Sequence, residues 1–126
     1  MGYGVNVNTG VIRKCGDIKW FDFKGGYSFY KFGDWELEHS TIIDTTNYYL
    51  DEQKNHEEYI YWKNEDGNLV FRDAYNQSRR TISISKVIRD LKRLLKEDDD
   101  KKLEECIKVL EADKKKGLKL VLFEGT

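Results

Sequence analysis

The feature that most constrains this chain is a dense run of aromatic residues near its amino-terminal end. Residues Ile18–Trp35 read IKWFDFKGGYSFYKFGDW and contain eight of the seventeen aromatic residues of the chain. Successive side chains of a strand point to opposite faces, so Ile18 and Trp20 are expected on one face and Phe21 and Phe23 on the other. A small β-fold has a single interior. Part of the run is therefore expected at a contact surface, because a sizeable exposed apolar patch usually indicates one.

The second half of the run alternates in the same way, which places Tyr27, Phe29 and Lys31 on one face. Two interpretations stay open for these rings. They form a platform on which a ligand stacks, or they are buried beneath other elements of the chain. The second interpretation is physically reasonable, because two helices with narrow apolar stripes are not stable alone and must pack on something.

Composition limits the class of protein. The length of 126 residues suits one domain, and a formal net charge of −1 gives no global attraction to nucleic acid or to acidic membranes. The first residues, MGYGVNVNTG, lack the features of a signal peptide, and no apolar run approaches transmembrane length. Cys15 and Cys106 match no metal or redox spacing. We interpret them as reduced thiols of a cytoplasmic protein, with a disulfide between them as the less favoured alternative. We expect no membrane partner.

Residues 1–83 have the pattern of strands joined by turns. A polar segment, about Ser40–His56, interrupts the pattern and is expected to be irregular. The expected turns are Asn8-Thr9-Gly10, between Val5/Val7 and Val11/Ile12; Cys15-Gly16-Asp17; Gly25-Gly26, between IKWFDFK and YSFYKF; Gly33-Asp34; and Asn64-Glu65-Asp66-Gly67, between EEYIYWK and NLVFRDAY.

The periodicity changes to helical at Ser83–Ser85. Apolar residues then recur at helical spacing in two successive stretches, first Val87, Ile88, Leu91, Leu94 and Leu95, and then Leu103, Cys106, Ile107 and Leu110. Asp98-Asp99-Asp100 and Lys114-Lys115-Lys116 suit the two ends of the second helix, because their charges complement the helix dipole. Gly117 fits a carboxyl-terminal cap, and LKLVLFE is typical of a strand.

Part of the amino-terminal region resembles the cold-shock domain family. Gly16-Asp17-Ile18-Lys19-Trp20-Phe21-Asp22 is similar to the family's opening strand, G-x-[VI]-K-W-F-N. At the family's spacing, Gly26-Tyr27-Ser28-Phe29-Tyr30 is similar to G-[FY]-G-F-[IV], its first nucleic-acid-binding motif. The resemblance extends more weakly over residues 16–83, through Glu36–Ser40 and Ala74-Tyr75-Asn76.

This resemblance implies a small antiparallel barrel of the OB type that binds single-stranded RNA or DNA by stacking bases on exposed rings. The expected fold is α+β: a barrel with an amino-terminal hairpin over residues 1–83, followed by a helical hairpin and a terminal strand over residues 84–126, packed on the barrel or on a partner. The resemblance assigns nucleic-acid contacts to Lys19, Trp20, Tyr27, Phe29, Lys31 and His39.

The charge distribution supports an alternative. Residues 35–58 carry seven carboxylates and a single lysine, Lys54, which disfavours a polyanion there. The segment 36–58 could instead dock a basic protein partner, as an inhibitor or immunity-type protein does. Its candidate contacts are Glu36, Glu38, Glu57 and Glu58. The apolar stripes and LKLVLFE also allow a homodimer.

No catalytic motif stands out. The chain has no phosphate-cradling glycine loop, nucleophile elbow or zinc-binding histidine pattern. His56 lies beside two glutamates in NHEEY, but this spacing fits no zinc site. We therefore expect a binding protein that is not an enzyme and that uses no metal or cofactor, and we rank a catalytic role for scattered carboxylates last.

Overall fold

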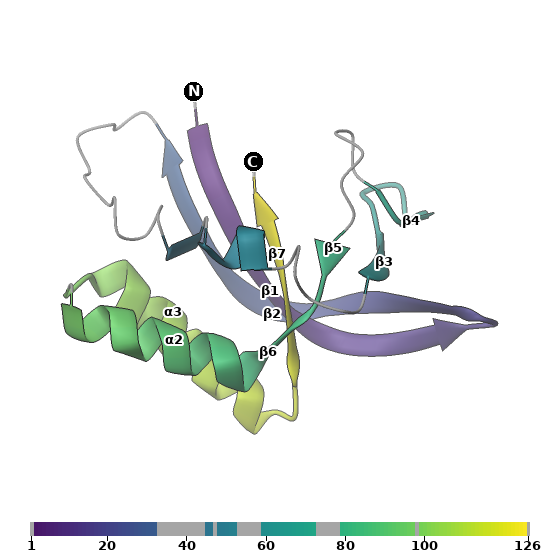
Figure 1. Ribbon diagram of the computed structural model, residues 1–126. Helices are drawn as coiled ribbons and strands as arrows, with labels where there is room; N and C mark the ends of the chain where they lie inside the picture. Colours follow the sequence, from purple (N-terminus) through teal and green to yellow (C-terminus); the bar gives the residue numbers. More distant parts are fainter. Residues whose placement is uncertain are drawn as a thin grey trace.

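Two long antiparallel strands, β1 (Gly2–Cys15) and β2 (Ile18–Phe32), dominate the computed structural model. The structure describes residues 2–32, 45–46, 48–52, 59–72, 79–97 and 99–125. It is an α+β fold in which the strand order along the sheet is β4-β3-β2-β1-β7-β6 (Figure 1). The remaining elements are β3 (Tyr59–Lys63), β4 (Leu69–Val70), β5 (Arg79–Arg80), β6 (Ile82–Ser83), α2 (Ile84–Glu97), α3 (Lys101–Lys115) and β7 (Leu120–Gly125).

Two expected turns prove to be the middle of these strands. Asn8 pairs with Gly26, Thr9 with Gly25 and Gly10 with Phe23, so Lys24 is the extra residue of a β-bulge. Gly26 has φ 139°, and a Cβ atom there would lie 2.1 Å from the Val7 carbonyl oxygen. Glycine clusters indicate turns, but they also occur where two backbones approach closely. The predictions of a hairpin at Asn8-Thr9-Gly10 and of a turn at Gly25-Gly26 were therefore wrong.

Two other turns are confirmed. Gly16, with φ 63°, lies in the short turn between β1 and β2. Asn64 organises the turn between β3 and β4, because its side-chain oxygen accepts hydrogen bonds from the backbone N–H groups of Asp66 and Asn68, each at 3.0 Å. The expected turn at Gly33-Asp34 lies outside the described residues.

The sheet is not the expected closed antiparallel barrel. β3 pairs with β2 in parallel, through Trp20 with Tyr61 and Phe21 with Trp62. β5 pairs with β3, while β6, one residue further along the chain, pairs with β7. β7 lies between β1 and β6, so the carboxyl-terminal part of the chain shares one sheet with the amino-terminal part.

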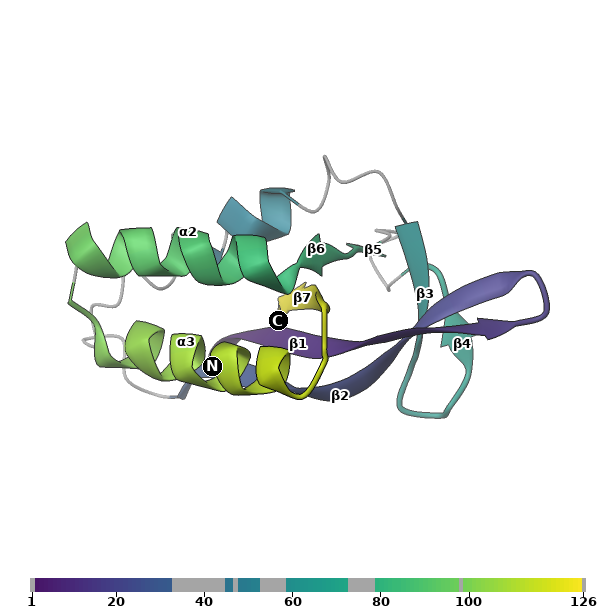
Figure 2. The same ribbon diagram turned by 90° about the horizontal axis from the view of Figure 1, so that it is seen from below.

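The two helices form where the periodicity predicts them. The side chain of Asp100 accepts a hydrogen bond from the Lys102 backbone N–H at 2.9 Å and caps α3, and Gly117 follows the helix with φ 96°. α2 and α3 lie side by side on one face of the sheet, over the end of the hairpin that holds the amino terminus (Figure 2).

The helices divide the hairpin into two halves. The helix-covered half comprises residues 2–9 of β1 and 25–32 of β2. The distal half, residues 10–24, extends beyond the helices (Figure 2). Their boundary is held by the buried Thr9 hydroxyl, which donates a hydrogen bond of 2.7 Å to Asp113 of α3.

The buried apolar residues form two clusters, one on each face of the sheet. The larger cluster lies between the sheet and the helices and includes Val5, Val7, Phe29, Tyr49, Val87, Leu91, Leu103, Leu110, Val121 and Phe123. Residues 45–46 and 48–52 are helical, although the segment that contains them was expected to be irregular. Tyr49 lies in the second of these stretches, and its ring stacks on that of Phe123 with 5.0 Å between the ring centres. The smaller cluster lies on the opposite face and contains Phe21, Ile60, Trp62 and Leu122.

Both cysteines are free thiols: Cys15 is exposed and Cys106 is buried. Burial raises the pKa of the Cys106 thiol well above its usual range. Within the described ranges, no helix has the length and apolar character needed to cross a bilayer.

Candidate functional site

The bulge at Lys24 decides which aromatic side chains share a face. The alternation of β2 shifts by one residue there, so Trp20 lies on the same face of the sheet as Tyr27 and Phe29. Phe21 lies on the opposite face, in the smaller core. The expected separation of Trp20 from Phe21 is therefore confirmed. The bulge also brings together the three rings that the cold-shock resemblance assigned to one platform.

The helices cover two of these three rings. Phe29 is only 6% exposed and packs in the larger core. Tyr27 meets the Phe29 ring edge-on at 4.9 Å, and its hydroxyl donates a hydrogen bond of 2.8 Å to Glu105 of α3. Burial, followed by the carboxylate of Glu105, raises the pKa of Tyr27 above its usual range. Phe29 thus has no open ring face in this structure, and Tyr27 is engaged with α3.

Trp20 lies beyond the helices and begins a row of rings that crosses three neighbouring strands. Its register partner on β3 is Tyr61, and the Tyr61 ring lies 4.9 Å from that of Phe71, the residue after β4. All three side chains are partly exposed. We call Trp20, Tyr61 and Phe71 the aromatic row.

Cationic groups border the aromatic row. The Lys63 ammonium lies 4.3 Å from the centre of the Trp20 ring, and the Arg72 guanidinium lies 5.9 Å from that of Phe71. A cation over a ring face is attracted by the ring quadrupole. Lys19, by contrast, alternates to the opposite face and pairs in register with Lys14.

The acidic residue nearest to the row in β2 is neutralised by its neighbours. Asp22 Oδ2 accepts hydrogen bonds from Arg13 Nε, at 2.5 Å, and from Lys24 Nζ, at 3.0 Å. The hydrogen bonds from Arg13 and then Lys24 lower the pKa of the Asp22 carboxyl, so it stays ionised and its charge is offset. Two cations thus surround one carboxylate at this edge.

An open hollow of about 540 Å³ is lined by Phe23 and Trp62, which lie on the face opposite the row. Lys63 and Arg72 also line it, together with the acidic Glu65. The Arg79 guanidinium lies 4.4 Å from the centre of the Trp62 ring and forms an ion pair of 3.0 Å with Glu124, which also lines the hollow. The hollow and the aromatic row therefore share two cations.

Sequence reasoning missed most of this row. Alternation in YIYWK does put Tyr61 and Lys63 on one face, and Ile60 and Trp62 on the other. The missing information was the parallel pairing of β3 with β2, which joins residues some forty positions apart and leaves no local signal.

Several predicted site residues lie outside what the structure describes: His39, Glu36, Glu38, Glu57 and Glu58, together with His56 and the side chain of Lys31. The acidic docking surface therefore stays a prediction. Among the residues that the structure does describe, no group of three or more His, Cys, Asp or Glu side chains could hold a metal ion.

Comparisons of this chain with protein-family models, with curated proteins and with solved structures find no match. Function has to be argued from the site itself.

Proposed function

We propose that this protein binds single-stranded RNA or DNA, with bases stacking on the aromatic row and phosphates contacting the cations at its border. The observation that carries the proposal is that three partly exposed rings neighbour one another: Trp20 of β2 pairs in register with Tyr61 of β3, whose ring contacts that of Phe71 just after β4. Lys63 and Arg72 lie against two of these rings. The role is one of binding and not of catalysis.

The dimensions of the row suit such a ligand. Neighbouring strands lie about 4.8 Å apart, so rings on three strands offer a platform for two or three bases. Sheets that present aromatic side chains stack two or three bases in this way in known RNA-binding modules. Each stacked base contributes about 1–3 kcal/mol whatever its identity, because every base has a π-face. The expected binding is therefore tolerant of sequence.

Lys63 has a second role in this proposal. Its ammonium rests on the Trp20 ring at the end of a flexible and exposed side chain. An arriving base displaces the ammonium from the ring, and the lysine then meets a phosphate of the same strand. Binding is expected to weaken as salt rises, because each phosphate contact releases counterions.

We also propose a distant relationship of this chain with cold-shock domains. The motifs KWF and GYSF support this relationship on sequence grounds. The strand pairings add partial support for an OB-like arrangement, because β5 pairs with β3 while β6, separated from it by Thr81, pairs with β7. Residues 79–83 thus pair with both β3 and β7, the two ends of the strand path β3-β2-β1-β7.

The test is a titration of labelled single-stranded DNA and RNA oligonucleotides, followed by fluorescence anisotropy at low and moderate salt. Trp20→Ala and Phe71→Ala are each expected to weaken binding by about 5- to 150-fold, the equivalent of one base that no longer stacks. Tyr48→Ala is the matched control, since Tyr48 is 45% exposed but lies outside the row.

Circular dichroism shows whether each variant still folds. Two results would overturn the proposal. One is the absence of binding by the wild-type protein at low salt. The other is a loss of affinity in Tyr48→Ala equal to that in Trp20→Ala.

A further inference from the structure

The outer face of α2 carries a continuous cationic stripe. A hollow of about 440 Å³ lies on this face, and its lining includes Ile88 and four cationic side chains. None of the described residues that line it is acidic. The cations Arg89, Lys92, Arg93 and Lys96 follow the spacing i, i+3, i+4 and i+7, which places them on one side of a helix. We call these four residues the α2 stripe.

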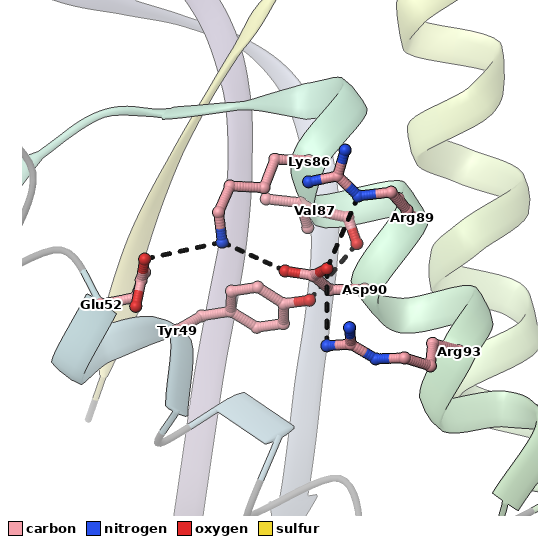
Figure 3. A network of polar contacts seen from close by, with 7 residues as sticks. All are labelled: Tyr49, Glu52, Lys86, Val87, Arg89, Asp90 and Arg93. Atoms are coloured by element: carbon pink, nitrogen blue, oxygen red, sulfur yellow. Dashed lines mark hydrogen bonds and ion pairs between the residues drawn. The ribbon is translucent and has the colours of Figure 1, made fainter.

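A buried carboxylate holds the two arginines of the stripe (Figure 3). Asp90 is 5% exposed, and its Oδ1 lies 3.8 Å from Arg89 Nε and 3.6 Å from Arg93 Nη2. At these distances each arginine forms an ion pair with Asp90 and not a hydrogen bond. The guanidinium N–H groups can therefore still donate hydrogen bonds to a ligand. The other oxygen, Oδ2, accepts a hydrogen bond of 3.1 Å from Lys86.

Lys86 connects this carboxylate to the segment that packs beside α2. Its ammonium also lies 3.5 Å from Glu52 (Figure 3). Burial opposes the charge on Lys86, but the hydrogen bond with Asp90 and the nearby Glu52 raise its pKa on balance. Lys86 thus binds one oxygen of Asp90, while Arg89 and Arg93 lie near the other oxygen and stay on the surface with side chains 74% and 66% exposed.

On α3, Lys108 pairs with Glu104 at 3.7 Å, one turn away on the same helix. On α2, the single carboxylate of Asp90 is shared by three cations, Lys86, Arg89 and Arg93. On α2, like charges lie one turn apart at Arg89 and Arg93 and again at Lys92 and Lys96, and such pairs destabilise a helix. Glu111 of α3 offsets only Lys92, at 3.1 Å. Such repulsion between like charges is expected on a surface whose binding partner supplies the negative charge.

We propose that the α2 stripe binds the sugar–phosphate backbone of a nucleic acid as a second contact surface, separate from the aromatic row. The choice of partner rests on the function proposed above. From residue 85 to residue 96 the face runs about 16 Å along the helix, which fits a linear polyanion better than a single phosphate. Arginine guanidinium groups match phosphate oxygens in a bidentate manner. Among the described residues, those that line the hollow include no aromatic side chain, so the proposed contact is with the phosphate backbone and not with the bases.

The probe that isolates this surface is an abasic oligonucleotide, which carries phosphates but cannot stack on the aromatic row. Wild-type protein is expected to bind it with a steep salt dependence. The double variant Arg89→Gln/Arg93→Gln is expected to lower the slope of log affinity against log salt by about 1.4, because each arginine neutralises one phosphate and each phosphate contact on a single strand contributes about 0.7. Lys92→Gln/Lys96→Gln should have the same effect without touching Asp90.

The matched control is Lys101→Gln/Lys108→Gln, which removes two exposed cations from α3. It should leave the slope unchanged. Circular dichroism and thermal melts show whether each variant folds. If Arg89→Gln/Arg93→Gln disturbs the helix, Lys92→Gln/Lys96→Gln still tests the proposal.

Three outcomes would overturn the proposal: no binding of the abasic strand at low salt, an equal loss in the α3 control, or tighter binding of polyglutamate through the same residues, which would indicate an acidic protein partner. The two proposals fail separately. Trp20→Ala should leave abasic binding intact. In one such outcome, the α2 substitutions weaken abasic binding while Trp20→Ala leaves the affinity for base-containing strands unchanged. That result would contradict the stacking function and support the α2 surface.

Discussion

The two halves of the β1–β2 hairpin are made of the same strands but differ in what covers them. In the helix-covered half, Phe29 lies in a core that reaches from β1 to β7 and both helices. In the distal half, one face holds the small cluster around Phe21 and Trp62, and the other face presents the aromatic row. On the face of the sheet that the helices contact, an aromatic residue of this run is therefore interior or surface according to the reach of the two helices.

The bulge is the second cause of this difference. Without the extra residue at Lys24, Trp20 and Phe29 would lie on opposite faces of the sheet. With it, they share a face, and α3 ends close to the bulge, where Asp113 meets Thr9. The position of one unpaired residue and the length of one helix together determine which rings a ligand could reach.

The largest expected effect comes from breaking the junction between the halves. Gly26→Ala places a Cβ atom 2.1 Å from the Val7 carbonyl oxygen at φ 139°. Backbone strain and overpacking together should lower the free energy of unfolding by about 4 kcal/mol or more. Urea denaturation measures the loss. Gly67→Ala is the control, since Gly67 also has a positive φ of 80° but has open space around it.

Gly67→Ala should cost only about 1 kcal/mol. Similar losses in the two glycine variants would show that the close approach at the bulge does not matter. The two halves would then not be joined as described.

A matched pair of core substitutions compares the two buried clusters on the opposite faces of the sheet. Leu110 and Leu122 are both fully buried, the first in the larger cluster and the second in the smaller one. Leucine-to-alanine changes cost about 2–5 kcal/mol, and the cost depends on how far the site can collapse. Leu110→Ala is expected near the upper end, because helices and sheet enclose it.

Leu122→Ala is expected near the lower end, because its cluster of four buried residues has an open hollow nearby. Chemical denaturation of both variants gives the difference. A larger loss for Leu122→Ala would mean that the smaller cluster, and not the larger one beneath the helices, contributes most of the stability.

The sequence predicted local features well and long-range ones poorly. The helices, the Asp100 cap, Gly117 and the turn at Asn64 follow from patterns within a few residues, and all are confirmed. The face of Trp20 relative to Phe21 also follows from alternation. The bulge was missed because Gly25-Gly26 has the same composition in a turn as at a close backbone approach.

The site itself depended on contacts between distant parts of the chain. Tyr61 could be assigned to a face of its own strand, but its position beside Trp20 requires the parallel pairing of β3 with β2. The burial of Phe29 likewise depends on where α2 and α3 pack. Local patterns cannot supply either fact, so the platform expected at Trp20, Tyr27 and Phe29 differs from the row that the structure presents.

The smallest expected effect concerns the ion pairs that border the aromatic row in the distal half. The pKa of Asp22 is lowered in the folded state by Arg13 and Lys24. Its contribution to stability is therefore present above the pKa of an unfolded aspartate, about 3.9, and is lost as the pH falls through the lower folded value. Asp22→Asn should remove this acid-dependent component and cost less than about 1 kcal/mol at neutral pH, because the pair lies near the surface.

Amide hydrogen exchange across the distal half, followed from neutral to acidic pH, measures the effect of Asp22→Asn locally. Glu104→Gln on α3 is the control, because its pair with Lys108 lies outside the hairpin. Faster exchange in the distal half of Asp22→Asn, with the helix-covered half unchanged, would show that the two halves open independently. Equal acceleration in both halves would mean that the hairpin opens as one unit, and that its two halves differ in covering alone.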